Sequence, residues 1–190
     1  MTQAPSKREL KKNILLFLKL LDQIPEFTYL GDPILRKKTS PVNLKDGLSI
    51  SGKLGKILIR YRKITGFGRG LAAPQIGIDK SVFVTFLDGK IKSYLNPKII
   101  SRSVRGNYCR ELCLSCGFVW PDVKRPETVN LEWKDETGKL VRQEFSGLEA
   151  RLVQHEYDHL YGIPNIDRAE RGTLQFCTSD PLAEKLRSHL

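Results

Sequence analysis

The sequence has few of the features that mark membrane-embedded or disulfide-stabilised proteins. No apolar run approaches the roughly 20 residues that a membrane-spanning helix needs. Cysteine is scarce, with four in 190 residues. Three of these, Cys109, Cys113 and Cys116, are close together in the sequence. Such crowding suits metal binding or free thiols better than a disulfide framework.

Acidic residues are also few, with 21 Asp and Glu against 32 Lys and Arg, which gives a formal net charge of +11. A basic charge favours a nucleic-acid surface such as the ribosome, an acidic membrane or an anionic substrate. The basic residues are scattered, so a solvated surface without a partner explains the charge equally well. With 40% hydrophobic and 28% charged residues, the chain has the composition and length of a single domain with a sizeable core.

Residues 8–22 have the periodicity of an amphipathic helix. Its apolar stripe, with lysines opposite, consists of Leu10, Ile14, Leu18 and Leu21. A lysine interrupts the apolar run and no small-residue cleavage site follows, so a secretory signal is not expected, and Glu9 and Asp22 count against a transit peptide. We expect a helix packed on the domain. The predicted division is a helical extension, residues 1–27, and a domain, residues 28–190.

The remaining patterns predict an α+β fold. In chain order they are a helix over 47–65, strands over 81–87 and 91–95 joined at Asp88-Gly89, strands over 129–133 and 140–145, and a helix over 147–160. Strands joined by short turns pair antiparallel. We therefore expect antiparallel sheets packed around the last helix, which carries a candidate metal site.

Histidine is scarcer still, and two of the three histidines, His155 and His159, lie on this last predicted helix. Positions i and i+4 share one helix face, so both imidazoles can reach one divalent ion. Glu156 lies beside them and can take a proton from a metal-bound water. The alternative is a chance arrangement on a solvated helix.

The residues after this helix offer no convincing third ligand. Where metzincins have a third histidine the chain has Asn165, an amide and a poor zinc ligand. Their methionine turn is also missing, because Met1 is the only methionine. Gluzincins take a glutamate from a later helix, and Glu170 and Glu184 are available, but residues 168–173 have no extended helical pattern.

Cys113, upstream of the histidines, is a better third ligand. A thiolate with two imidazoles leaves one position open for water, as a hydrolytic metal requires. Two rival interpretations use Cys109 and Cys116. Together with Cys113 they spell the cluster-binding triplet of radical enzymes, whose barrel is longer than this chain. A structural zinc site on the same cysteines would leave the pairing of Glu156 with two histidines unexplained.

Three segments together carry a family resemblance. They are Gly68-x-Gly70-Leu71-Ala72-Ala73-Pro74-Gln75, Glu111-x-Cys113-Leu114-Ser115 and Gln154-His155-Glu156-x-Asp158-His159-Leu160. In order and separation they resemble the three motifs of the peptide deformylases, and the resemblance runs from about Tyr29 to Pro164. It implies hydrolytic removal of the formyl group from the N-terminal formylmethionine of new polypeptides. The implied cofactor is one divalent metal ion, usually Fe²⁺, with Zn²⁺, Ni²⁺ or cobalt able to occupy the site.

The resemblance also implies the roles of the site residues. Cys113, His155 and His159 would hold the metal, which lowers the pKa of bound water. Glu156 would accept that proton and deliver it to the departing amine. The Gln75 amide and the backbone N–H of Leu114 would stabilise charge on the formyl oxygen. The residues expected to line the substrate cleft are Gly68, Arg69, Gly70, Glu111, Leu112, Leu148 and Leu152. Arg125 is expected to form a structural ion pair with Glu111, with a surface arginine as the alternative.

Two positions depart from the family pattern. Arg69 stands where the family usually has an aliphatic residue that lines the pocket for the methionine side chain, and Leu112 stands where it has glycine. The alternative function is therefore a deformylase-like metal protein that acts on another N-acylated peptide or only binds. The expected partner is an N-formylated nascent peptide, with the ribosome surface as a docking site and no membrane. We expect a monomer in the bacterial cytoplasm, or in an organelle if the source is eukaryotic.

Overall fold

All strand pairs in the described part of the chain are antiparallel. The structure is a computed structural model, and it describes residues 5–176. The main helices are α1 (Lys7–Gln23), α2 (Leu44–Thr65) and α3 (Gly147–His159). The strands are β1 (Gly70–Ala72), β2 (Val82–Leu87), β3 (Lys90–Arg102), β4 (Gly106–Arg110), β5 (Val119–Trp120), β6 (Asp122–Pro126), β7 (Thr128–Lys134), β8 (Leu140–Ser146) and β9 (Gln175–Phe176). Short 3₁₀ turns cover Pro33–Arg36, Ala73–Ile76, Leu114–Cys116 and Asn165–Arg168.

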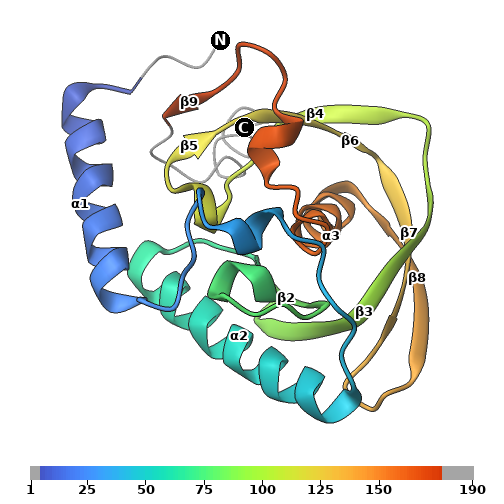
Figure 1. The fold of residues 1–190 in the computed structure, drawn as a ribbon. Coiled ribbons are helices and arrows are strands. Elements are labelled where there is room, and N and C mark those ends of the chain that lie inside the picture. Colours follow the sequence, from blue (N-terminus) through green and yellow to red (C-terminus); the bar gives the residue numbers. More distant parts are fainter. Residues whose placement is uncertain (1–4, 177–190) are drawn as a thin grey trace.

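Five strands form one sheet in the order β1-β2-β3-β7-β8, and the pairs β4-β6 and β5-β9 form two small sheets. The predicted α+β class, with antiparallel sheets around the helix over 147–160, is confirmed. Figure 1 shows α3 in the middle of the molecule, between the strands of the large sheet and the pair β4-β6. The sheet is therefore the wall against which the helix of the predicted metal site rests.

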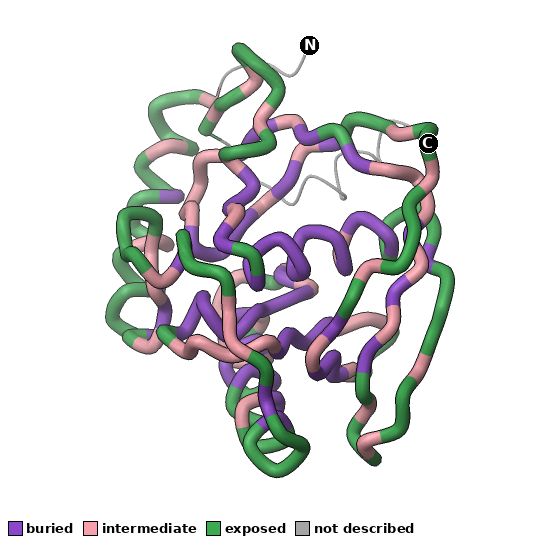
Figure 2. The backbone as a smooth tube through the Cα atoms, turned by 45° about the vertical axis from the view of Figure 1, so that its right-hand side comes forward, coloured by how far each residue is buried: buried purple, intermediate pink, exposed green. Residues whose placement is uncertain are grey.

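The alternation of side chains along the strands places a different helix on each face of the large sheet. Val82 and Val84 of β2 belong to a core cluster with residues of α2 such as Leu58. Phe83, between them, points to the other face and joins a second cluster with Val153 of α3. Buried residues accordingly gather in the interior on both sides of the sheet, as Figure 2 shows.

Helix α1 contacts the domain through a face that the sequence pattern did not predict. The Phe17 ring lies edge-on to Tyr29 and Phe118, and Leu20 is buried in the first core cluster. Most of the predicted stripe points outward instead, since Ile14, Leu18 and Leu21 are exposed and only Leu10 is half-buried. A helix with apolar residues on two sides can pack through either of them, and periodicity alone does not choose.

Helix α1 ends at Gln23, and the residues after it belong to the domain core. Ile24 is completely buried and Phe27 nearly so, both in the cluster that contains α2. The division at residue 27 into an extension and a domain stays a prediction. No helix among residues 5–176 is both long and apolar enough to cross a membrane.

Candidate metal centre and active site

Three side chains from two distant segments converge at the buried end of α3. Cys113 precedes the short turn Leu114–Cys116, whereas His155 and His159 lie one helical turn apart on α3. One potential ligand atom from each lies within 4.8 Å of the others, and the Cys113 Sγ and His159 Nε2 atoms are 3.2 Å apart. All three side chains are buried. They form the only such cluster of His, Cys, Asp and Glu among the described residues.

The second nitrogen of His155 is hydrogen-bonded to Glu111. The His155 Nδ1 atom lies 3.0 Å from Glu111 Oε2, so a proton on Nδ1 leaves Nε2 as the free ligand atom. Burial lowers the pKa of His155, but the hydrogen bond to Glu111 and its negative charge outweigh burial, so the pKa is raised. Glu111 thus orients the ring.

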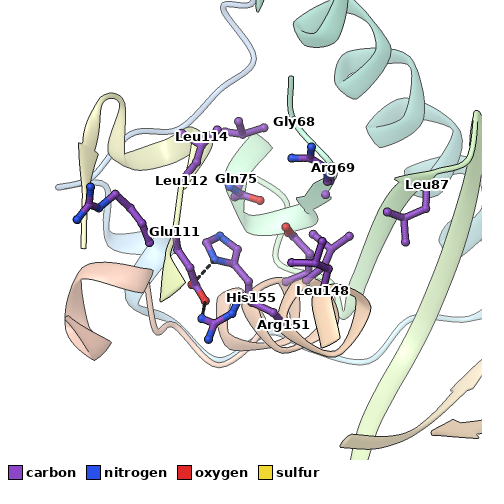
Figure 3. Close-up of a pocket in the computed structure, with 14 residues that line it drawn as sticks. Gly68, Arg69, Gln75, Leu87, Glu111, Leu112, Leu114, Leu148, Arg151 and His155 are labelled. Carbon is purple, nitrogen blue, oxygen red and sulfur yellow. Dashed lines mark hydrogen bonds and ion pairs between the residues drawn. The ribbon is translucent and has the colours of Figure 1, made fainter. Parts of the chain in front are cut away.

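Two arginines, Arg125 and Arg151, bind the Glu111 carboxylate. Figure 3 shows Arg151 beside it. Arg125 donates to both of its carboxylate oxygens, at 2.6 and 2.9 Å, and Arg151 donates to Oε1 at 2.6 Å. Burial alone would raise the pKa of Glu111, but the charge of Arg125 and the hydrogen bonds from His155 and Arg125 lower it well below its usual value. The predicted ion pair between Arg125 and Glu111 is present and buried, which excludes the alternative of a surface arginine.

The network continues into the segments around α3. Arg125 also donates to Asp158 at 2.7 Å, and Arg168 binds the same carboxylate. Asn165, which stands where another peptidase family has a histidine ligand, donates its side-chain amide to the Glu111 backbone carbonyl at 3.0 Å. Asn165 therefore anchors the strand segment that leads to Cys113.

Glu156 lies between the two histidines in sequence and faces the pocket. Burial raises its pKa to about 7, because a charged carboxylate is costly in an apolar surrounding. One of its oxygens, Oε2, is buried and has no hydrogen-bond partner among residues 5–176. Gly70 leaves the space that this carboxylate occupies, since a Cβ at that position would overlap Glu156. A carboxyl group with a pKa near neutrality suits proton transfer.

The Gln75 side chain has a fixed orientation. Its Oε1 atom accepts a hydrogen bond from the backbone N–H of Ala72 at 2.8 Å, which identifies the oxygen unambiguously. The amide nitrogen therefore points toward the cluster, 3.8 Å from Cys113 Sγ. Gln75 is almost completely buried, so its side-chain N–H groups already point to the site before a substrate binds.

A pocket of about 140 Å³ opens onto this site. It is lined by Gly68, Arg69, Gly70, Gln75, Leu87, Arg110, Glu111, Leu112, Leu114, Leu148, Arg151, Leu152, His155 and Glu156. All seven residues that we expected to line the cleft are among them, together with Gln75, Leu114 and Glu156. Sequence reasoning missed Leu87, Arg110 and Arg151. Leu152 and Arg151 lie in the same turn of α3 as His155, a helical spacing that could have pointed to Arg151.

The other sequence candidates are not members of the cluster. Cys109 and Cys116 are free thiols outside it, although the Cys116 side chain is hydrogen-bonded to that of Cys113. Glu170 is exposed at the surface, and Glu184 lies outside the described residues.

The residues of the cluster fit a divalent cation. A thiolate and two imidazoles are ligands that zinc and iron accept. Burial raises the pKa of Cys113 and lowers that of His159, so a bound cation would stabilise a Cys113 thiolate beside a neutral His159 ring. The His159 Nδ1 atom, on the far side of the ring, has no partner within the described residues.

Comparison with known proteins points to a single family. The family model described as polypeptide deformylase matches residues 24–174. The peptide deformylase of Pseudothermotoga lettingae is 42% identical over 144 residues, which cover 76% of this chain and 82% of that protein. The peptide deformylase of Synechocystis is 36% identical over 163 residues, which cover 83% and 86%.

Solved structures agree with the sequence comparison. A peptide deformylase from Synechococcus elongatus in complex with actinonin superposes with a TM-score of 0.69 at 38% identity, covering 77% of this chain and 79% of that one. The peptide deformylase from Thermotoga maritima superposes with a TM-score of 0.68 at 31% identity, covering 76% and 96%.

Proposed function

Since this chain belongs to the polypeptide deformylase family, we propose that it removes the formyl group from the N-terminal formylmethionine of newly made polypeptides through the residues around the metal centre. The observation that carries the proposal is the convergence of Cys113, His155 and His159 beside Glu156 at the end of a pocket. The relatives that share this family are named as deformylases, so deformylation is the activity of the chain.

Cys113, His155 and His159 would hold the cation, for which we propose Fe²⁺, with Zn²⁺ or Ni²⁺ as alternatives. A divalent cation bound there supplies Lewis acidity, which activates water and polarises a carbonyl oxygen. Glu111 keeps His155 in the tautomer that a ligand needs. The charge of Arg125 and the hydrogen bonds from His155 and Arg125 keep that carboxylate ionised.

Glu156 would act as the proton carrier. Its unpartnered Oε2 atom can accept a proton from the attacking water and pass it to the amine nitrogen as the bond between carbon and nitrogen breaks. The Gln75 amide would donate a hydrogen bond to the formyl oxygen as negative charge develops on it, together with the backbone N–H of Leu114. Because Ala72 already holds Gln75, this donor needs no rearrangement.

The substrate would enter over Leu148 and Leu152 and lie between two segments. Strand β1 is an edge strand of the large sheet, since only β2 pairs with it. An edge strand has unpaired backbone groups that can bind an extended peptide. The segment with Glu111 and Leu112 forms the opposite wall of the pocket.

A second candidate function concerns the substrate rather than the chemistry. Arg69 and Leu112 both line the pocket, so the first side chain of the substrate can differ from methionine or the acyl group can differ from formyl. We further propose a cytoplasmic monomer that meets its substrate at the ribosome; the bacterial relatives support the cytoplasmic location.

The test is a steady-state assay of anaerobically iron-loaded protein on formyl-Met-Ala-Ser and on its acetylated counterpart. We expect turnover of the formylated peptide and a loss of about 100-fold or more in Glu156→Gln, with the metal content unchanged by elemental analysis. Turnover no faster than that of the Glu156→Gln control would contradict the main proposal. Faster turnover of the acetylated peptide would support the second candidate.

A further inference from the structure

Helix α1 is an addition to the family domain. The family model begins at residue 24, directly after α1 ends at Gln23. None of its residues lines the pocket. The proposed reaction therefore involves no residue of this helix. In Figure 1 it lies at the outer left edge of the molecule, away from α3.

The helix surface is divided into three stripes, because residues three, four and seven apart share a face. The first stripe holds Asn13, Phe17 and Leu20 and packs on the domain. The second holds Ile14, Leu18 and Leu21, which are 48%, 50% and 37% exposed. The third holds Arg8, Lys12 and Lys19, all exposed. One face of the helix thus binds the protein, and two faces of different chemistry point to solvent.

The exposed apolar stripe is wider than its three members. Leu15, 67% exposed, lies between it and the basic stripe. Toward the start of the helix, the line of Ile14, Leu18 and Leu21 continues with two exposed lysines, Lys11 and Lys7. The helix contains five basic and two acidic residues, a net charge of +3. Apolar side chains bordered by lysines on one helix are typical of binding at the surface of an anionic membrane.

We propose that α1 is a membrane-surface anchor, which lies in the interface of an anionic lipid bilayer with Ile14, Leu18 and Leu21 between the acyl chains and Arg8, Lys12 and Lys19 at the lipid phosphates. The long lysine and arginine side chains can reach the phosphates while the apolar stripe is inserted. The net charge of +11 on the whole chain attracts the protein to the same surface.

The helix is held in shape before it meets a lipid surface. A capping box fixes its start, since the Glu9 carboxylate accepts from the Ser6 backbone N–H at 2.7 Å and Ser6 Oγ accepts from the Glu9 N–H at 3.3 Å. Phe17 and Leu20 fix its orientation on the domain. Membrane binding therefore carries no free-energy cost for forming the helix, whereas many membrane-active peptides fold only when they bind.

Two other occupants fit the stripes less well. A second copy of the chain would bring two basic helices together, and like charges repel. An RNA surface would neutralise Arg8, Lys12 and Lys19 but would leave the apolar stripe exposed, because phosphates offer it no contact. The sequence did not predict a membrane partner, because it has no apolar run long enough to span a bilayer. A helix that lies in the plane of the membrane surface does not need such a run.

The experiment is flotation of the full-length protein with vesicles. Vesicles of phosphatidylglycerol and phosphatidylcholine in equal parts should bind at least about tenfold more protein than vesicles of phosphatidylcholine alone. The triple variant Ile14→Ser/Leu18→Ser/Leu21→Ser and the double variant Lys12→Glu/Lys19→Glu should each lose about tenfold or more of this binding. Both variants should deformylate a soluble peptide at the wild-type rate, so the result does not depend on the proposed function.

Matched controls carry the same changes elsewhere. Val104→Ser/Leu140→Ser removes exposed apolar residues from the sheet region, and Lys90→Glu/Lys139→Glu reverses exposed charges on two hairpins. Both should bind vesicles as the wild type does.

Equal binding to the two kinds of vesicle, or wild-type binding by the triple serine variant, would overturn the proposal. Concentration-dependent dimerisation in sedimentation velocity without vesicle binding would do so too, in favour of a second copy. RNA binding that is insensitive to the serine changes, again without vesicle binding, would favour a nucleic-acid surface.

Discussion

Arg69 and Leu112 are the two residues at which we expected the pocket to depart from the family pattern, and both line its wall. Leu112 is partly buried and packs against the core cluster that contains α2, so part of its side chain is directed away from the cleft. Arg69 is half-buried between Gly68 and Gly70. A side chain at either glycine would overlap neighbouring atoms. The charge of Arg69, rather than the bulk of Leu112, is therefore the change with the larger effect on an apolar substrate.

The substitution Arg69→Ile should raise kcat/KM for formyl-Met-Ala-Ser about tenfold, mainly through a lower KM. An apolar wall removes the cost of partly desolvating a guanidinium group when the methionine side chain binds. Steady-state kinetics on both proteins measures the effect. Arg102→Ile, which removes an exposed arginine of β3, serves as the control and should leave both constants unchanged. A lower kcat/KM in Arg69→Ile would mean that the guanidinium contributes to binding this substrate.

Helix α3 is an unusual element because nine of its 13 residues are buried and most of these are polar. They are Arg151, Gln154, His155, Glu156, Asp158 and His159. Such a helix is stable only if its buried polar groups are paired. Gln154 donates to the carbonyls of Pro126 and Ala150, and Asp158 binds Arg125 and Arg168. The polar network that holds α3 is thus the same one that orients His155.

The substitution Arg151→Met should destabilise the protein by about 3–5 kcal/mol, because it removes one cation from a buried, hydrogen-bonded carboxylate. Arg151 also donates to the carbonyls of Val123 and Asn107, which would lose their partner. Urea unfolding with matched m-values measures the change. The control is Arg142→Met on β8, whose guanidinium is mostly exposed, so its ion pair with Glu132 should contribute less than about 1 kcal/mol. Equal effects of the two substitutions would show that burial of the pair does not matter.

On the scale of the whole molecule, the candidate metal centre joins a segment beside the small sheet β4-β6 to a helix that packs on the large sheet. Cys113 follows β4, which pairs with β6, whereas both histidines lie on α3, which packs on the large sheet. A cation bound to all three ligands ties these parts together in the folded state only. Its binding free energy therefore adds to the stability of the fold.

Removal of the metal with a chelator should lower Tm by on the order of 10 °C. A ligand present at 1,000 times its Kd contributes about 4 kcal/mol, and 1 kcal/mol shifts Tm by about 2–4 °C in a chain of this size. Scanning calorimetry of loaded and stripped protein, with elemental analysis of both, measures the shift. In Cys113→Ser the difference should shrink, together with the metal content. An unchanged Tm after complete metal loss would contradict a structural contribution of the ion.

The elements of the fold that could be predicted are those whose signal is local. The turn at Asp88-Gly89 and the alternation around it predicted the hairpin that the structure forms as β2 and β3. Strands β1, β4, β5, β6 and β9 were not predicted. Of these, β1, β5 and β9 are only two or three residues long, and β5 and β9 pair across more than 50 residues of sequence. The outward orientation of Ile14, Leu18 and Leu21 was missed as well. A helix with two apolar sides does not encode which of them the domain covers.

The sequence by itself determined the chemistry of this protein: a thiol, two imidazoles at helical spacing, a glutamate between them, and three motifs in a specific order. These are properties of residue type and spacing, so they are readable without a structure. Only the tertiary structure decided which polar groups meet. The approach of the Gln75 amide to Cys113, the bond from Arg151 to Glu111 and the free face of α1 depend on contacts between segments far apart in the chain. Such contacts follow from packing across the sheet, and no local pattern carries them.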